Sequence, residues 1–188
     1  MKLTILLLIS ISYSQLFGQH YIRTKKNLGV VGMYNLGQMN AIDPSYQLAL
    51  CKQFGRYTLP ELGVKAVSQE SGLQINSLYA GVQFRKNLIK LNERKKGAKC
   101  KLEILEGFVT PEFNYYLSNT VSANPAPFSL RYGLGLYHVE SGGSKRSRAW
   151  ATKVEVYHRS YVQTSTPYQQ EFGVALRIQH FKTYDFLK

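Results

Sequence analysis

Apolar and polar side chains alternate along most of this chain with a period of two residues. Near the C-terminus, for example, Phe172, Val174, Leu176 and Ile178 are separated by polar, charged or small residues. A strand turns successive side chains to opposite faces, so this period predicts β-strands with one apolar and one polar face. The pattern recurs in residues 28–36, 45–54, 61–66, 78–85, 106–117, 128–136, 150–159 and 171–179. The sequence therefore predicts an all-β fold with about eight strands of roughly ten residues each.

The length and uniformity of the apolar faces predict an eight-stranded antiparallel up-and-down transmembrane β-barrel. About ten residues tilted by about 45° cross a bilayer as one barrel strand. Closing the sheet into a barrel also leaves no unpaired strand edge in lipid. The alternative is a soluble periplasmic β-barrel with its apolar faces inside, because alternation alone does not say which face is buried.

The polar faces carry charges of both signs in the middle of the strands. In a small membrane barrel these faces line a packed interior, so opposite charges are expected to pair there. Small residues such as Gly81, Gly133, Gly135, Gly173 and Ala175 are expected to leave room for long charged side chains. The predicted interior ion pairs involve Lys65, Arg85, Glu106, Glu112, Arg131, Lys153, Glu155, Glu171 and Arg177.

The N-terminus predicts an export signal ahead of a single barrel domain. Lys2 supplies a positive charge, and residues 3–11 form an apolar run that is too short to span a bilayer as a helix. Gly18 is a small residue at the expected cleavage point. Residues 1–18 are therefore predicted to be a cleaved signal peptide, and residues 19–188 the barrel. The alternative is that the first residues form a buried strand.

The chain is strongly basic, and its cations outside the predicted interior gather at one end of the strands. It has 24 Lys+Arg against 11 Asp+Glu, which gives a formal net charge of +13. Small barrels usually keep both termini in the periplasm, and the connections that then face outside, residues 37–45, 68–76, 118–127 and 160–169, contain no Lys or Arg. The basic residues predicted to form a docking face in the periplasm are Arg94, Lys95, Lys96, Lys99, Lys101, Lys145, Arg146 and Arg148.

A basic face of this size attracts acidic partners through screened Coulomb forces. The expected partners are outer-membrane lipid and an acidic periplasmic or membrane protein. The alternative is that the basic turns only rest on anionic lipid headgroups. Nucleic acid is not expected, because an exported chain rarely meets it and no DNA- or RNA-binding motif is present.

The C-terminal strand carries a resemblance to a known family. EFGVALRIQHF, residues 171–181, resembles the aromatic-terminated last strand of small outer-membrane β-barrels of the OmpA/OmpX architecture, although this chain continues with KTYDFLK. The segment LFGQ and the many tyrosines resemble the PorT-like accessory barrels of type IX secretion and the TraO-like barrels of conjugative elements. The resemblance implies a non-enzymatic accessory or structural subunit of an envelope machine, in the outer membrane of a Gram-negative bacterium.

One short motif keeps an enzymatic alternative open. YHRSY, residues 157–161, resembles the His-x-Ser pair of outer-membrane lipid A deacylases, which implies roles for His158 and Ser160, with Glu171 orienting the histidine. Against this, Tyr161 stands where that pattern has Asn, and alternation places Glu171 on the face opposite to His158. The main interpretation therefore assigns no catalytic residue.

The remaining reactive side chains predict no cofactor or metal. The spacing of His20, His138, His158 and His180 fits no zinc site, and no phosphate-binding loop is present. The two cysteines, Cys51 and Cys100, are set in an exported chain, where a disulfide is permitted. Both a bridge and two separate thiols remain open.

Overall fold

The computed structural model describes residues 23–38, 44–54, 57–69, 72–96, 99–117, 127–141, 148–162 and 170–185. Within these ranges there is no helix, and so none that is long and apolar enough to span a membrane. The strands are β1 Arg23–Gln38, β2 Ser45–Cys51, β3 Thr58–Gln69, β4 Gly72–Lys96, β5 Lys99–Tyr116, β6 Phe128–Ser141, β7 Arg148–Tyr161 and β8 Gln170–Asp185. The prediction of an all-β chain with eight antiparallel strands is confirmed, whereas the predicted signal peptide lies outside the described residues.

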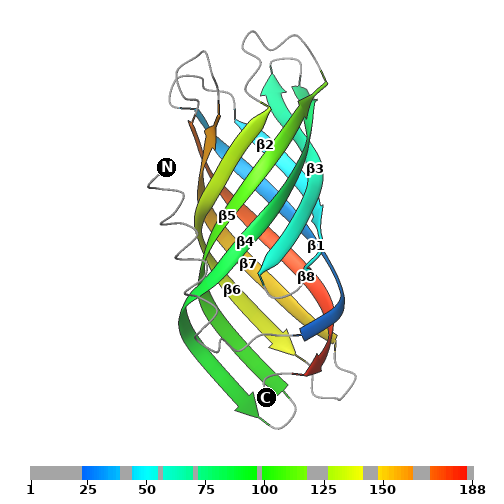
Figure 1. Cartoon of the computed structure of the whole chain (residues 1–188), viewed down its shortest axis with the longest axis vertical. Coiled ribbons are helices and arrows are strands. Elements are labelled where there is room, and N and C mark those ends of the chain that lie inside the picture. Colours follow the sequence, from blue (N-terminus) through cyan, green and yellow to red (C-terminus); the bar gives the residue numbers. More distant parts are fainter. Residues whose placement is uncertain are drawn as a thin grey trace, which may run out of the picture.

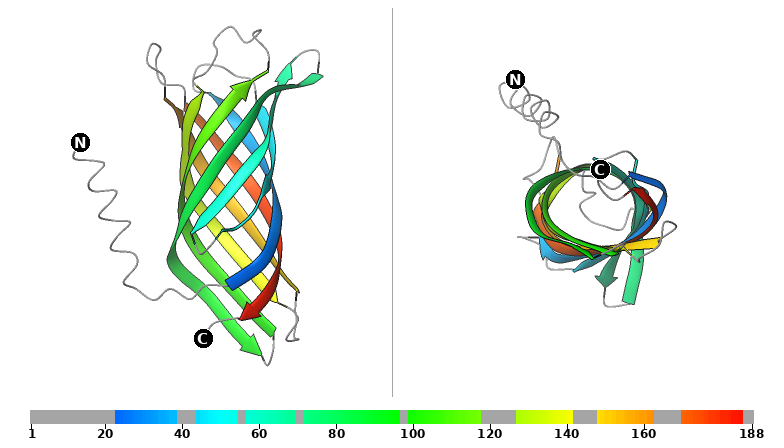
Figure 2. Two further views of the ribbon diagram at one scale, coloured as in Figure 1. Left: turned by 45° about the vertical axis from the view of Figure 1, so that its right-hand side comes forward. Right: turned by 90° about the horizontal axis from the view of Figure 1, so that it is seen from below.

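The eight strands form one closed barrel in chain order (Figure 1). Each strand pairs antiparallel with the next, and β8 pairs with β1 to close the ring, which is visible along its axis in Figure 2. Val31 of β1, for example, lies opposite Ala49 of β2 and Arg177 of β8. Closure satisfies the backbone hydrogen bonds on both sides of every strand wherever all eight strands are present.

The alternating pattern separates the two surfaces of the barrel. Along β2, every second residue is buried and every other one is exposed. The exposed positions are apolar, and large side chains such as Leu62 at 66% and Val156 at 63% exposure point outward. The buried positions include most of the charged strand residues whose side chains the structure describes. The apolar faces thus lie outside the barrel, which is opposite to the arrangement that a soluble barrel with an apolar interior requires.

The strands differ in length more than the sequence pattern predicted. They range from 7 residues in β2 to 25 residues in β4, instead of roughly ten each. The alternating segments 78–85 and 106–117 left the residues between them without a predicted strand, but β4 and β5 continue as a paired hairpin to Lys96 and Lys99. The pairing is supported by Leu102 and Ile104 of β5, which are buried in an apolar cluster with residues of β6 and β7. The hairpin projects beyond the rest of the barrel at one end (Figures 1 and 2).

The barrel wall is incomplete at the end where this hairpin projects, which we call the basic end. β3 begins at Thr58, opposite Phe84, so residues 85–96 of β4 lie beyond the last β3 pair. β2 ends at Cys51, opposite Gly29, so residues 23–28 of β1 lie beyond the last β2 pair. We call the space between these parts of β1 and β4 the wall opening.

Candidate functional site

Arg131 on β6 lies at the centre of an ion-pair network inside the barrel. Its guanidinium donates to Glu61 at 2.6 Å and to Glu112 at 2.7 Å, and lies 3.6 Å from Glu155. All four side chains are fully buried. Alternation places them here, because β3, β5, β6 and β7 each turn one polar face toward the barrel axis.

A second arginine, Arg177 on β8, shares these carboxylates. Its Nη2 atom donates to Glu61 at 2.6 Å and to Glu155 at 3.3 Å. Glu61 is therefore held between two arginines, one on each carboxylate oxygen. Toward the basic end, Lys153 pairs with Glu106 at 3.2 Å and with Glu155 at 3.1 Å. Arg85 lies 3.9 Å from the same Glu106.

The network continues toward the opposite end of the barrel through Arg159 on β7. This side chain pairs with Glu112 and Glu171, each at 2.8 Å. Glu171 also accepts hydrogen bonds from Lys65 at 2.6 Å and from the Tyr161 hydroxyl at 2.9 Å. Each charge in this region has at least one opposite charge within bonding distance, as burial of ions requires.

The structure places all nine residues of the predicted interior set on the inner face and brings them into one network. Sequence reasoning missed two members, Glu61 and Arg159, although both stand in register with the polar face of their strands. Among the side chains that the structure describes, the buried charged residues are six cations and five carboxylates: Lys65, Arg85, Arg131, Lys153, Arg159 and Arg177 against Glu61, Glu106, Glu112, Glu155 and Glu171. The interior is thus close to neutral, and nearly all of the net charge of +13 lies elsewhere.

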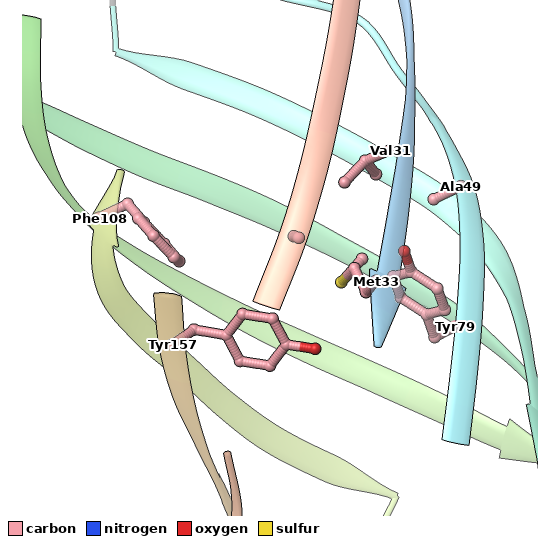
Figure 3. Packing of buried hydrophobic residues seen from close by; sticks show 7 residues of the cluster. Val31, Met33, Ala49, Tyr79, Phe108 and Tyr157 are labelled. Carbon is pink, nitrogen blue, oxygen red and sulfur yellow. The ribbon is translucent and has the colours of Figure 1, made fainter. Parts of the chain in front are cut away.

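Apolar side chains fill the space around the central ion pairs. Val31, Met33, Tyr79, Phe108 and Tyr157 come from different parts of the ring and point into the barrel (Figure 3). The guanidinium of Arg131 lies over the Phe108 and Tyr157 rings, at 5.9 and 5.3 Å from their centroids. Because Arg131, Arg159 and Arg177 have no solvent exposure, the barrel centre is filled by side chains and does not form an open channel.

Glycines allow this packing in two different ways. A Cβ atom at Gly135 would lie 2.2 Å from Cε of Lys153, so this glycine makes room for a charged side chain as predicted. A Cβ atom at Gly133 would instead meet the backbone oxygen of Val156 at 2.1 Å, and one at Gly173 would meet the Tyr157 ring. Gly133 is therefore required by close strand approach rather than by a charged neighbour.

The predicted docking residues lie at the basic end, on several strands. Arg94 and Lys101 are exposed and stand directly opposite each other on β4 and β5. In the backbone register, Lys96 of β4 is paired with Lys99 of β5 at the hairpin tip, and Arg148 is paired with Lys182 of β8. Lys95 also lies in β4, whereas Lys145 and Arg146 lie outside the described residues. Like charges directly across a strand pair are destabilising, whereas on its other side Lys101 lies opposite Glu140 of β6.

Glu103 is one of three carboxylates near these cations, with Glu93 on β4 and Glu140 on β6. Nζ of Lys101 lies 3.3 Å from the Oε1 atom of Glu103, and Nδ1 of His138 lies 3.2 Å from the same oxygen. The hydrogen bond from Lys101 is the largest contribution that holds the pKa of Glu103 below its ordinary value. This carboxylate offsets part of the Lys101 charge, while Arg94 keeps its charge exposed.

His158 and Ser160 lie on the outward face of β7, away from the basic end. Nδ1 of His158 is 3.4 Å from the Ser160 hydroxyl, and Nε2 is 3.3 Å from the side-chain oxygen of Gln170. Glu171 points into the barrel and bonds to Lys65, so it does not orient His158. The proposed triad with Glu171 is wrong for this reason, and the neutral amide of Gln170 takes that position.

Other reactive groups form no site in the part of the chain that the structure describes. Cys51 is a free and buried cysteine, so it is not in a disulfide. No cluster of three or more His, Cys, Asp or Glu residues suited to a metal occurs in the described ranges. The chain matches no protein-family model, and searches of curated proteins and of solved structures give no match. The barrel geometry and the charge distribution are therefore the basis for a functional proposal.

Proposed function

We propose that this chain is a non-enzymatic outer-membrane β-barrel that serves as an accessory or structural subunit of an envelope machine. The observation that carries the proposal is the separation of charge. The side chains that fill the interior balance their own charges, the barrel wall is apolar outside, and the excess positive charge gathers at the basic end. A closed barrel of this kind carries no solute, so the basic end is the part that is available for interaction. Protein secretion of type IX and conjugative transfer are the machines suggested by the resemblance.

Membrane insertion is supported by the outer surface. From Phe172 to His180, β8 covers about 26 Å at about 3.3 Å per residue, or about 20 Å of membrane when tilted by about 40°. Ring pairs border this band, with Tyr34–Tyr46 and Phe113–Phe128 near one rim and Trp150–His180 near the basic end. This matches the apolar band and aromatic girdles of membrane barrels.

The single tryptophan provides a direct test of insertion. Trp150 is 57% exposed on the outer surface. In vesicles made with brominated lipids, its fluorescence should be strongly quenched, and the folded protein should migrate differently on SDS gels before and after boiling. A folded, unquenched protein that remains in the aqueous fraction would exclude the membrane placement.

Docking is supported by the unfavourable placement of like charges at the basic end, and the partner is an acidic periplasmic or membrane protein. The test is a mild-detergent pull-down of the tagged chain from outer membranes, with Lys145, Arg146 and Arg148 replaced by Glu. The variant should lose its stoichiometric partner while keeping its heat-modifiable migration. A control introduces the same number of carboxylates in the connection between β5 and β6 by replacing Asn119, Thr120 and Ser122 with Glu. If the partner is unchanged in the first variant, the docking face is wrong.

Lipid A deacylation is a second candidate, favoured by the contact between His158 and Ser160. The Ser160→Ala variant should abolish any deacylation of lipid A by the purified barrel, as followed by mass spectrometry. Activity that survives this change, or its absence from the unmodified protein, would remove the enzymatic candidate.

A further inference from the structure

Rows of paired residues climb around the barrel because its strands are tilted. One row starts at Arg85 of β4, and after one turn of the ring it returns to β4 at Gln74, 11 residues nearer the end opposite the basic end. The members between these two are, in order, Phe108, Gly133, Tyr157, Gly173, Asn35, Ser45 and Val67. With strands about 4.8 Å apart, this offset corresponds to a tilt of about 43° and a rise of roughly 3 Å per strand. Residues on one row therefore lie at different depths in a membrane.

Lys52 lies inside the apolar band of the outer surface. Cys51 of β2 is on the same row as Ala151 of β7, three strands further along in the direction of the rise. Lys52 and Trp150 follow these two residues toward the basic end, so Lys52 lies roughly 10 Å nearer the opposite end than Trp150. Nζ of Lys52 is 5.2 Å from the centroid of the Phe54 ring, which is two residues nearer the basic end. The ammonium is therefore directed from inside the band toward the basic end.

Lys86 on β4 also carries its charge inside this band. It is on the same row as Val156 of β7, three strands further along, and Val156 is six residues from Trp150. Lys86 is therefore roughly 5 Å nearer the opposite end than Trp150. Both lysines are exposed. A lysine inside the apolar layer of a bilayer is costly unless its ammonium reaches polar or anionic groups. The two lysines thus favour a headgroup that lies deeper than the level of Trp150.

The two lysines border one surface, which we call the β2–β4 patch: Lys52, Phe54, Thr58, Phe84 and Lys86. The backbone N–H of Phe54 donates to the Thr58 carbonyl at 2.9 Å, and Thr58 pairs with Phe84. The Phe54 and Phe84 rings are 54% and 47% exposed. The backbones of Lys52 and Lys86 are roughly 16 Å apart in this register, so two extended lysine side chains can reach one phosphate group. Among the described residues between 44 and 69, the one carboxylate is Glu61, and it is buried inside the barrel.

We propose that the β2–β4 patch binds the headgroup of an anionic phospholipid from the leaflet at the basic end. The site rests on the membrane insertion of the proposed function but not on its docking face, which contains none of these five residues. Lys52 and Lys86 pair with the phosphate, and the acyl chains lie against the rings of Phe54 and Phe84. A zwitterionic lipid is a poorer occupant because its own cation is repelled by the lysines. An acidic protein is also a poorer occupant, since the patch lies within the apolar band.

The test measures lipid preference beside the patch by fluorescence quenching. The reporter chain carries Trp150→Phe and Phe84→Trp, and the unchanged chain reports from Trp150 on β7. Each chain is reconstituted in phosphatidylcholine vesicles with a minor fraction of brominated phosphatidylglycerol or of brominated phosphatidylcholine. The reporter should show a preference for phosphatidylglycerol of at least about fivefold, the factor for one lysine beside an anionic headgroup. At Trp150 the preference should be at least about threefold smaller.

Two paired variants of the reporter chain assign the preference to residues. Lys52→Gln combined with Lys86→Gln should reduce it to within about twofold of equal binding. Arg94→Gln combined with Lys101→Gln removes the same charge from the basic end and should change it by less than about twofold. The control residues are exposed and paired across β4 and β5, so both variants alter only outward-facing side chains.

The outcomes separate the lipid site from membrane insertion itself. Equal quenching of the reporter by both brominated lipids would refute the site and leave insertion standing. The same preference at Trp150 as at the reporter, or an equal loss in the Arg94 and Lys101 variant, would assign the attraction to the basic end as a whole and refute a local site. No quenching by either lipid at either position would refute insertion, and the lipid site with it.

Discussion

Replacing Glu61 by Gln tests whether the interior network stabilises the barrel through balanced charge. Glu61 is fully buried and accepts from Arg131 and Arg177, each at 2.6 Å. When the carboxylate of residue 61 becomes a neutral amide, each hydrogen bond from an arginine is weaker by about 1 kcal/mol. The two bonds together therefore lose about 2 kcal/mol. The amide also turns a donor toward one guanidinium, which adds about 1–3 kcal/mol. The expected loss is about 3–5 kcal/mol, the range for breaking a buried ion pair.

The assay is urea unfolding of the barrel in detergent micelles, followed by Trp150 fluorescence and linear extrapolation. Glu140→Gln, the same change at an exposed position of β6, should alter the free energy of unfolding by less than about 0.5 kcal/mol. Adding Arg177→Met to Glu61→Gln removes one positive charge as well, so the interior returns to its original net charge. Glu155, which loses its contact with Arg177, keeps its ion pair with Lys153. The double variant should therefore be more stable than the sum of the two single losses predicts. A loss below about 1 kcal/mol for Glu61→Gln, or simple additivity, would refute the charge-balance argument.

Three further predictions address packing, the buried thiol and the basic end. Gly63→Ala should lower the free energy of unfolding by about 1–3 kcal/mol, because the added Cβ would lie 2.3 Å from the Leu48 carbonyl oxygen, whereas Gly32→Ala meets nothing within 4 Å and should be neutral in the same urea titration. In a Cys100→Ser background, Cys51 should react with maleimide only after unfolding, and rapid labelling of the folded barrel would contradict its burial. Because Lys101 lowers the pKa of Glu103, their interaction stabilises the fold at pH values above the pKa of this carboxyl group in the unfolded chain. This stabilisation is lost as the pH falls through the pKa in the folded chain. Lys101→Ala should raise the pKa of Glu103 in carboxyl NMR titrations.

The alternation of side chains predicted the faces of the strands because a strand has only two faces and the period is short. It also placed charges such as Arg131 and Glu112 on a common surface, since neighbouring strands keep their polar faces in step. Glu61 was missed because it follows Pro60 near the start of a strand, where alternation had few residues to extend over. Its partners come from β6 and β8, and only the closed ring brings these strands opposite β3.

The strand ends at the basic end were not predictable from the same pattern. Residues 86–94 interrupt strict alternation through bulges near Leu88 and Leu91, so the sequence pattern predicted no strand there. The pairing is instead supported by contacts distant in sequence, such as those of Leu102 and Ile104 with Val139 and neighbouring residues. The early ends of β2 and β3, which create the wall opening, likewise depend on register across the sheet.

Under the proposed membrane placement, the uneven distribution of cations also favours one orientation of the barrel during insertion into the bilayer. Under the proposed placement, the end opposite the basic end must pass through the bilayer during assembly. Its connections, residues 37–45, 68–76, 118–127 and 160–169, carry Asp43 and Glu70 as their only charged residues. Moving a Lys or Arg past the midplane on the lipid face of a barrel costs about 2–4 kcal/mol. Entry in the reverse orientation would carry the cations of the basic end across the bilayer, so the charge pattern acts as a barrier that selects one topology during insertion.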